Sequence, residues 1–263
     1  MTLVTGKSKL KKTPLLVIKA LSRRITSLGI GNVFTSRIPP SSRLVYIDIG
    51  MHKHALQLRF VKTAFAGKLQ LKTIGFEAHP DYFKQAIGSV QSEKNDQFLN
   101  LAVVGPAQGK TVTLHLNGGD GLGDSLIRAK SNQSIEIPAI RLSEVLKSDG
   151  IDRSNEVVIL RMNIEGAELY VLEDLLKSNL VSRIDGYYGY WDDPLKIGGD
   201  IASRFRNVMA TIEIDIFPFN DRDFRSRLRL SVIKYDLTTS ILAALLKRSS
   251  TSSLTNSQQA KSK

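Results

Sequence analysis

Segments typical of strands and segments typical of helices alternate through the middle of the chain. Four apolar, often β-branched runs predict buried strands, at 43–50, 71–78, 100–105 and 156–164. Helix-forming segments follow three of these runs, at 55–65, 79–90 and 166–180. Because a strand that returns parallel to its neighbour needs a crossover, this alternation predicts an α/β fold with a mostly parallel sheet and helices on both faces.

Further strands are expected beside this central pattern. The alternating runs 110–116 and 134–140 predict an inserted antiparallel pair. Later strands are expected at 183–190 and 209–219. The run 227–235 is then expected to return as a hairpin beside 209–219.

The basic charge of the chain is concentrated at its two ends. The net charge is +12, with 37 Lys and Arg against 25 Asp and Glu. Nine of the basic residues lie in 1–43, four lie in 247–263, and neither segment contains an acid, so 24 bases face all 25 acids elsewhere. Domains that bind nucleic acid usually carry positive charge on the folded face. We therefore expect no nucleic-acid partner.

Composition divides the chain into three parts. Residues 1–43 are expected to form a basic N-terminal arm with an amphipathic helix and a linker, 44–246 the folded domain, and 247–263 a disordered polar tail. Three alternatives remain for the arm: a helix packed on the domain, a helix lying on an anionic membrane surface, or a transit peptide. No apolar run approaches the roughly 20 residues that span a membrane. We expect a cytoplasmic protein, with peripheral membrane contact through the arm as the open alternative.

Polar residues follow the ends of the predicted strands. Asp48 and Gly50 close the first strand, Glu77 closes the second, and Asn163 and Glu165 follow the strand at 156–164. In parallel sheets, ligands bind beyond the carboxyl ends of the strands. A carboxylate placed like Glu77 commonly accepts hydrogen bonds from ribose hydroxyls, and helix capping is the alternative role. The pattern therefore predicts a nucleotide-like ligand at this edge of the sheet.

Six motifs occur together in the order and spacing of a known family. They are "YIDIG", "IGFEAHPDYF", "NLAVVG", "GLGDSLI", "IPAIRLSEVL" and "VVILRMNIEGAELYVLEDL". In this combination the chain resembles the FkbM family of S-adenosylmethionine-dependent methyltransferases, many of which methylate hydroxyl oxygens. The resemblance implies a Rossmann-like class I methyltransferase fold over 44–246. Its sheet would be seven-stranded and mostly parallel, with helices on both faces and an antiparallel last strand.

The resemblance also implies roles for individual residues. Asp48 and Gly50 match the first cofactor loop of the family, and Glu77 matches the acid that holds the ribose. The main chain near Ala102 would lie at the edge of the adenine, and Glu165 would lie near the methionyl group and the substrate entrance. The positions implied to bind S-adenosylmethionine are Asp48, Gly50, Met51, Glu77, Ala78, Asn100, Ala102 and Asn163.

Two motifs depart from the family pattern. The first loop is usually D-x-G-A-x-x-G, but here Met51 replaces the alanine and His54 replaces the final glycine. A histidine forced to a positive φ angle would cost about 1–3 kcal/mol, which corresponds to an affinity roughly 5- to 150-fold weaker. "RMNIEG" replaces the usual "KIDVEG", so Asn163 cannot act as a carboxylate base. The candidate catalytic residues are Glu165, Asn163 and His54, with Glu165 or a loop histidine as the proton acceptor.

A metal site is not expected. The chain has no cysteine and four histidines. His52, His54 and Asp48 could present imidazole and carboxylate ligands from one extended segment, but they match no known ligand spacing.

The acceptor side of the site is less defined by sequence. The segment "DGYYGYWDDP" combines aromatic rings with acids at the end of a predicted strand. Trp191, Asp192 and Asp193 are the candidates for a solvent-facing surface that binds a sugar ring, while core packing is the alternative for the aromatic residues. The glycine-rich segment 117–125 predicts a mobile loop that could cover the site.

Two functions follow as hypotheses. The first is an S-adenosylmethionine-dependent O-methyltransferase that acts on a hydroxyl of a glycan or related small molecule. The second is a catalytically inactive methyltransferase-fold protein that serves as a binding or scaffold module, peripheral to a membrane through its basic arm. Saturable binding of S-adenosylmethionine distinguishes the two.

Overall fold

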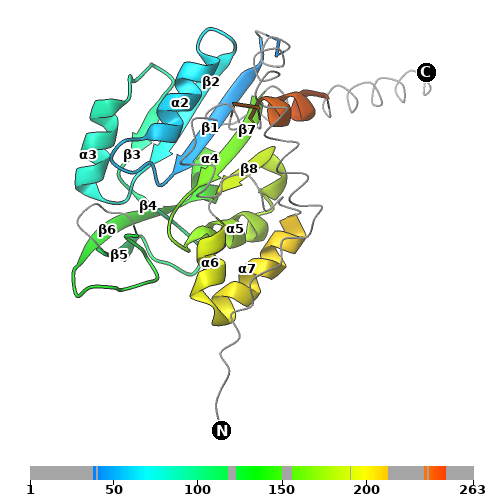
Figure 1. Ribbon diagram of the computed structural model, residues 1–263. Helices are drawn as coiled ribbons and strands as arrows, with labels where there is room; N and C mark the ends of the chain where they lie inside the picture. Colours follow the sequence, from blue (N-terminus) through cyan, green and yellow to red (C-terminus); the bar gives the residue numbers. More distant parts are fainter. Residues whose placement is uncertain are drawn as a thin grey trace, which may run out of the picture.

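A five-stranded parallel sheet forms the centre of the molecule. The computed structural model describes residues 38–39, 41–117, 123–149, 156–189, 191–212, 234–235 and 237–246. The strands lie in the order β3 (Gln97–Leu99), β2 (Gln70–Phe76), β1 (Arg43–Ile49), β7 (Glu156–Met162) and β8 (Gly186–Gly189), and all neighbours are parallel (Figure 1). Their carboxyl ends therefore meet at one edge of the sheet.

The central strand β1 is buried on both faces. Its residues from Leu44 onward are all buried, which explains why its sequence is a continuous apolar run rather than an alternating one. Asp48 is the polar exception within this run. The register places it opposite Gly75 of β2 and Arg161 of β7. The sequence thus brings a charged pair into the middle of an apolar sheet.

A second, three-stranded sheet stands beside the carboxyl edge of the first. Its strands lie in the order β4 (Ala102–Val104), β6 (Ser134–Arg141) and β5 (Thr111–His115). β5 and β6 pair antiparallel, as the sequence predicts, and β4 pairs parallel with β6. A small apolar cluster that includes Leu114 and Ile137 holds this sheet together.

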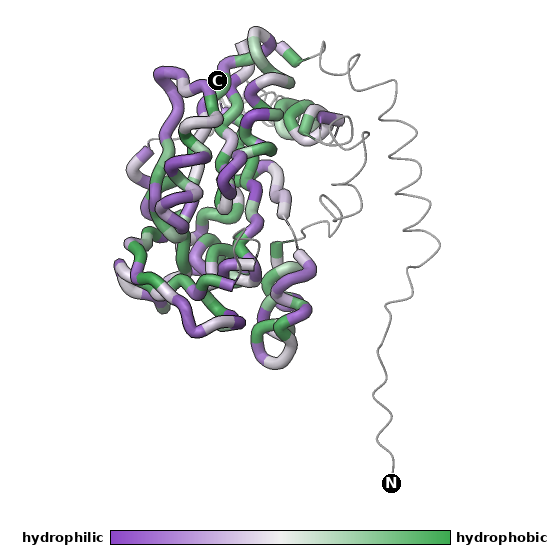
Figure 2. The backbone as a smooth tube through the Cα atoms, turned by 60° about the vertical axis from the view of Figure 1, so that its left-hand side comes forward, coloured by the Kyte–Doolittle hydropathy of each residue, from purple (hydrophilic) through white to green (hydrophobic). Residues whose placement is uncertain are grey.

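Helices cover both faces of the main sheet, as expected. The helices α4 (Leu142–Ser148), α5 (Glu168–Lys177) and α7 (Gly199–Ile212) pack on one face. The helices α2 (Leu56–Phe65) and α3 (Pro80–Ser89), together with the helical residues 237–246, pack on the other. The short helices η1 (Val181–Arg183) and α6 (Asp192–Ile197) flank β8 in the chain. Figure 2 shows hydrophobic and hydrophilic residues alternating along the helices, as amphipathic packing requires.

The strand count differs from the expected seven-stranded sheet. Among the described residues the sheets have five and three strands. Of the two expected late strands, the one at 183–190 is present as β8, whereas the described part of the other, 209–212, is not a strand. Met209–Ile212, expected at the start of a strand, lies in α7. Four buried residues of α7 recur at helical spacing: Ala202, Phe205, Val208 and Met209. Their packing against the sheet therefore outweighs the strand preference of the β-branched residues, and the segment is helical.

Parts of the expected organisation lie outside the described residues. These parts are 213–233 with most of the expected hairpin, 1–37 with the helix of the arm, and the tail 247–263. Within the expected hairpin run, Lys234 and Tyr235 are helical. Ile38, from the expected linker, is 4% exposed and packs in the core with Leu44. None of the described helices combines the length and apolar character needed to cross a bilayer.

Candidate functional site

A pocket lies where the carboxyl ends of β1, β2 and β7 face the second sheet. Its volume is about 730 Å³ with the open solvent at its mouth included. Gly50, Ala78, Ala102 and Asn163, all predicted to bind cofactor, line it. Its polar side chains are His52, Glu77, Tyr82, Asp124, Asn163 and Glu165.

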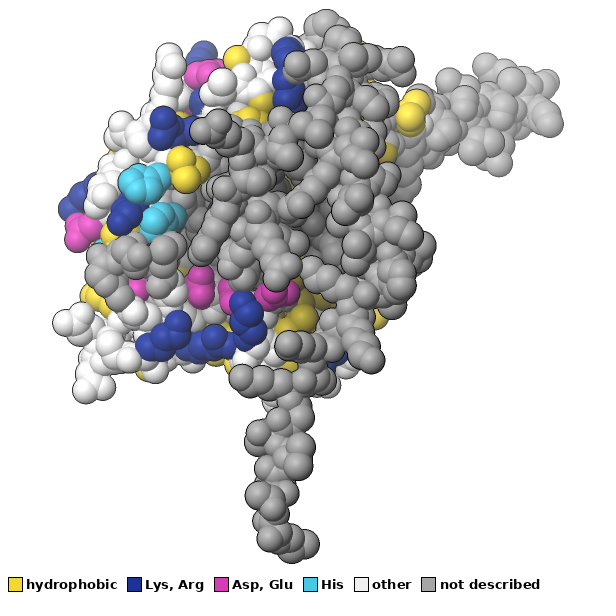
Figure 3. Space-filling model, in the orientation of Figure 1, with side chains coloured by type: hydrophobic (Ala, Val, Ile, Leu, Met, Phe, Trp, Pro, Cys, Tyr) yellow, Lys and Arg dark blue, Asp and Glu magenta, His cyan; other side chains and the backbone are white. Residues whose placement is uncertain are grey.

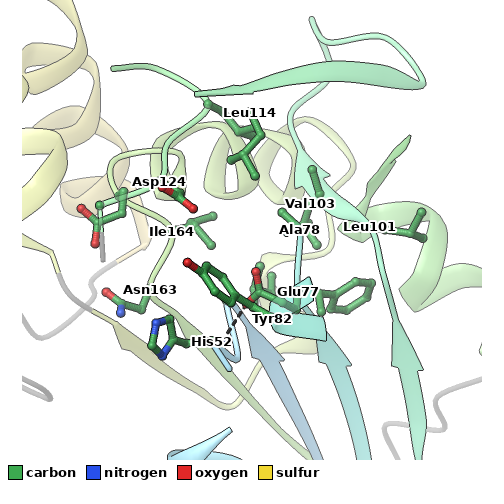
Figure 4. Close-up of a pocket in the computed structure, with 17 residues that line it drawn as sticks. His52, Glu77, Ala78, Tyr82, Leu101, Val103, Leu114, Asp124, Asn163 and Ile164 are labelled. Carbon is green, nitrogen blue, oxygen red and sulfur yellow. Dashed lines mark hydrogen bonds between the residues drawn. The ribbon is translucent and has the colours of Figure 1, made fainter. Parts of the chain in front are cut away.

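Glu77 presents its carboxylate to the pocket from the end of β2 (Figure 4). Its Oε2 accepts the backbone N–H of His52 at 2.7 Å, and its Oε1 accepts the backbone N–H of His79 at 2.9 Å. Burial raises the pKa of Glu77, and the N–H groups of His79 and His52 partly oppose that rise. His79 caps α3 through its own ring, so helix capping is not the role of Glu77. Each carboxylate oxygen keeps a lone pair for a ligand hydroxyl.

Asn100 fixes the turn that carries Glu77. Its Nδ2 donates to the carbonyl oxygens of Glu77 at 2.8 Å and of Ala78 at 3.1 Å. Asn100 is not among the residues that line the pocket. It therefore supports the site from behind, whereas the sequence places it in contact with the cofactor.

The loop after β1 differs from its expected geometry. Gly50 has φ 84°, and a Cβ on it would lie 2.2 Å from the carbonyl oxygen of Asn163, so glycine is required there. The other left-handed residues of the loop are His52 at φ 58° and Ala55 at φ 42°. His54 does not have a positive φ angle, so the cost that a histidine forced into that geometry would carry does not arise there; the left-handed backbone lies at His52 and Ala55 instead.

Two residues of this loop lie away from the pocket. Met51 is 2% exposed, and its Sδ occupies the space where a Cβ on Gly75 would be. His54 is exposed and does not line the pocket, so it is not placed to act as the proton acceptor. Of the two loop histidines, His52 lines the pocket. Met51 thus fills the core beneath the loop rather than contacting a ligand.

Asp48 lies behind the pocket wall. Its carboxylate is fully buried, and Nη1 of Arg161 donates both to its Oδ1 and to the carbonyl oxygen of Gly50, each at 2.7 Å. Burial raises the pKa of Asp48, and the Arg161 guanidinium partly opposes that rise. Asp48 does not line the pocket. Its carboxylate anchors Arg161, which in turn holds the carbonyl oxygen of Gly50.

The turn from β7 to α5 presents Asn163 and Glu165 to the pocket. Glu168, 0% exposed, shapes this turn because its carboxylate accepts the backbone N–H groups of Ile164 at 2.7 Å and Gly166 at 2.8 Å. The turn is tightly wound, with Glu165 at φ 55° and Gly166 at φ 105°. Glu168 is therefore a structural residue that lies one layer behind the pocket.

The buried Glu168 should make folding stability depend on pH. Burial raises its pKa from 4.5 to about 7, against the opposing backbone hydrogen bonds. The folded state then binds the proton more tightly, so stability falls as pH rises from about 4.5 to about 7. Glu168→Gln removes this titration. Urea titrations at pH 5, 6, 7 and 8 measure the free energy of unfolding of both proteins. The excess of the wild type over Glu168→Gln should shrink by on the order of 2 kcal/mol between pH 5 and pH 8.

A matched control isolates this effect. Glu93, whose side chain is 66% exposed, is changed in Glu93→Gln, which should keep the pH slope of the wild type. A constant stability gap between the wild type and Glu168→Gln from pH 5 to 8 would contradict the assignment.

Glu165 lies among charges of both signs at the mouth of the pocket. Burial raises its pKa, Asp193 raises it further, and Lys130, Lys196 and Arg128 lower it. Figure 3 shows acidic side chains in a row beside a band of Lys and Arg side chains on one face of the molecule. A carboxylate whose pKa is raised towards neutrality is a better proton acceptor at neutral pH than an ordinary one.

The second sheet and α3 contribute some pocket residues that were not predicted from the sequence. Tyr82, in the first turn of α3, has its ring stacked on His79 at 4.1 Å between centroids, and Figure 4 shows its hydroxyl pointing into the pocket. Leu101, Val103 and Leu114 contribute apolar side chains to the pocket lining. One sequence signal could have identified Tyr82 as a pocket residue, namely its position shortly after Glu77 at the start of a predicted helix.

The loop at 117–125 was expected to cover the site, and the described part of it reaches the pocket. Gly123 and Asp124 line the pocket, while 118–122 lie outside the described residues. Ser125 ties this segment to the turn after β7, since its Oγ donates to the carbonyl oxygen of Glu165 at 3.1 Å.

The expected aromatic surface for a sugar is wrong. Trp191 is 3% exposed and packs in the core, with its ring 6.2 Å from that of Phe205. Asp193 is 7% exposed, and only Asp192 of the three candidates is exposed. Packing of α6 against α7 turns the indole inward, which the local composition could not reveal. Asp193 still influences the site, through its charge beside Glu165.

The described residues contain no group of three His, Asp or Glu side chains placed to hold a metal ion. His52 and His54 have ring centroids 5.9 Å apart, at an angle of 72°.

Comparison with known proteins gives one match. The family model for the methyltransferase FkbM domain matches residues 48–226. Searches of curated proteins and of solved structures gave no match. The matched stretch begins at Asp48 and contains every residue named above as a pocket residue.

Proposed function

This chain belongs to the FkbM methyltransferase family and is a methyltransferase, and we propose that it uses S-adenosylmethionine to methylate a hydroxyl oxygen of a glycan or related small molecule. The observation that carries the cofactor assignment is the carboxylate of Glu77, presented to the pocket with one backbone N–H on each oxygen. These two N–H groups hold the acid in position. Its remaining lone pairs suit the two hydroxyls of a ribose.

The rest of the pocket fits the same cofactor. Leu101, Val103 and Leu114 supply the apolar surface that an adenine ring requires, on one side of Glu77. Gly50 and Asn163 lie on the other side, where the methionyl part would extend. Gly50 has no room for a Cβ, so the backbone comes close to the neighbouring turn at this point.

Bound S-adenosylmethionine supplies a methyl group on a positively charged sulfur. In the transfer, the acceptor oxygen forms a bond to the methyl carbon, the carbon–sulfur bond breaks with its electron pair going to sulfur, and the hydroxyl proton must be removed. Glu165 is our nominee to take that proton, because its carboxylate lines the pocket and its pKa is raised. Positioning of the two reactants in a shielded site supplies most of the rate in such a displacement.

The test of this function is calorimetric titration of the full-length protein with S-adenosylmethionine and S-adenosylhomocysteine. Saturable binding of both is expected, and Glu165→Gln should still bind both saturably. Transfer of labelled methyl to a panel of hydroxyl-bearing glycans should then be lost in Glu165→Gln. Absence of binding to either compound at millimolar concentration would sink the enzymatic proposal and favour an inactive binding or scaffold protein.

A further inference from the structure

His52 is the one pocket-lining residue, within the described chain, whose side chain can carry a positive charge. The charged side chains around it in the pocket are all acidic: Glu77, Asp124 and Glu165. Figure 4 shows His52 and Asn163 on the side of Glu77 away from Leu101, and both residues line the pocket. The pocket lining therefore combines three acids with one imidazole, and that imidazole lies on the side of Glu77 away from Leu101.

The backbone of the loop after β1 has few donors left for a ligand. The N–H groups of Gly50 and Met51 both donate to the carbonyl oxygen of Phe76, at 2.9 and 3.1 Å. The N–H of His52 donates to Glu77, and that of Ala55 donates to the carbonyl oxygen of His52. An anionic group bound beside this loop must therefore take its hydrogen bonds largely from side chains.

From this arrangement we infer that the imidazole of His52, together with the amide of Asn163, holds the α-carboxylate of the methionyl group. The inference rests on the proposed use of S-adenosylmethionine. The methionyl end carries an ammonium and a carboxylate. Asp124 and Glu165 attract the ammonium and repel the carboxylate, whereas His52 and Asn163 can donate to the carboxylate. His52 is thus a positioning residue that orients the amino-acid end of the cofactor.

The backbone geometry allows a clean substitution at this position. His52 has φ 58°, a conformation that glycine adopts without cost and most other residues avoid. His52→Gly therefore removes the ring while keeping the backbone N–H that Glu77 accepts. His54→Gly is the matched control, because His54 is exposed, lies two residues further along and does not line the pocket.

The experiment titrates the full-length wild type and both variants with three ligands. These are S-adenosylmethionine, its decarboxylated analogue, and 5′-methylthioadenosine, which lacks the amino-acid end altogether. A hydrogen bond to a charged group contributes about 1.5–3 kcal/mol, so His52→Gly should bind S-adenosylmethionine about 10- to 100-fold more weakly. Its affinity for the other two ligands should equal that of the wild type, and His54→Gly should match the wild type for all three.

The three ligands distinguish failure of this inference from failure of the proposed function. Equal affinity of His52→Gly and the wild type for S-adenosylmethionine would overturn the inference while leaving the proposed function in place. Equal losses for all three ligands would also overturn it, because the ring would then act on the adenosine part or on the fold. If the wild type binds none of the ligands, the proposed function and this inference fail together.

Discussion

Glu77→Ala is expected to weaken binding of S-adenosylmethionine by about 100- to 10,000-fold. Two ribose hydroxyls would each lose a charged acceptor, at about 1.5–3 kcal/mol per hydrogen bond, and about 1.4 kcal/mol corresponds to tenfold in affinity. The substitution also leaves the backbone N–H groups of His52 and His79 without their acceptor, so the loop and the start of α3 lose a shared anchor. Calorimetric titration measures the loss of binding.

Two further variants separate binding from folding. Glu77→Gln keeps one carbonyl acceptor but sets an amide donor against the N–H of His52 or His79, so its affinity should lie between those of Glu77→Ala and the wild type. Glu93→Ala removes an exposed acid and should bind the cofactor normally. Unchanged affinity in Glu77→Ala, with the fold intact by urea titration, would show that the ribose is held elsewhere.

Arg161→Met should destabilise the fold by about 3–5 kcal/mol, the usual cost of leaving one member of a buried ion pair alone. Asp48 is fully buried, and its Oδ2 already has no hydrogen-bond partner among the described residues. Without Arg161, its Oδ1 also loses its partner, and so does the carbonyl oxygen of Gly50. The free energy of unfolding from urea titration at neutral pH measures this effect.

The pH dependence of Arg161→Met identifies its cause. Burial already raises the pKa of Asp48, and Arg161 is the main group that opposes the rise. In the variant, Asp48 in the folded state should hold its proton to higher pH than in the unfolded state. The stability deficit should therefore be smaller at pH 5 than at pH 7.5.

Two controls complete this test. Arg161→Lys keeps a positive charge and should retain most of the stability. The double variant Asp48→Asn with Arg161→Met removes both charges, and it should recover part of the loss because a neutral pair avoids an unpaired buried charge. If the double variant is no more stable than Arg161→Met, the loss arises from packing rather than from the unpaired carboxylate.

The sequence predicted the parts of the site that depend on chain order alone. The strand ends at Asp48, Glu77 and Asn163 are local features, marked by apolar runs that stop at a polar residue. Parallel strands bring such ends together at one edge, so Glu77 and Asn163 could be placed in one pocket without coordinates. The glycine required at position 50 could also be predicted, because Gly50 stands at the end of the first apolar run, two residues after Asp48.

The wrong predictions concerned the direction in which a side chain points, or the choice between helix and strand, rather than the place of a residue in the chain. Met51 and His54 belong to the right loop, but one side chain turns into the core and the other into solvent. Trp191 is next to the predicted strand, yet α7 covers it. The start of the expected strand at Met209 became helix because four apolar residues could be buried together only at helical spacing.

The sequence by itself determined the α/β layout, the edge of the sheet that carries the site, and the acid at its centre. Each of these depends on short-range patterns, namely apolar runs and the polar or turn residues that end them. Only the tertiary structure decided which groups meet. Asp48 and Arg161 are 113 residues apart, and the register of β1 against β7 makes them a buried pair. The same packing turns His52 towards the pocket and His54 away from it. Such contacts follow from register and from the fit of side chains between layers, which no local pattern specifies.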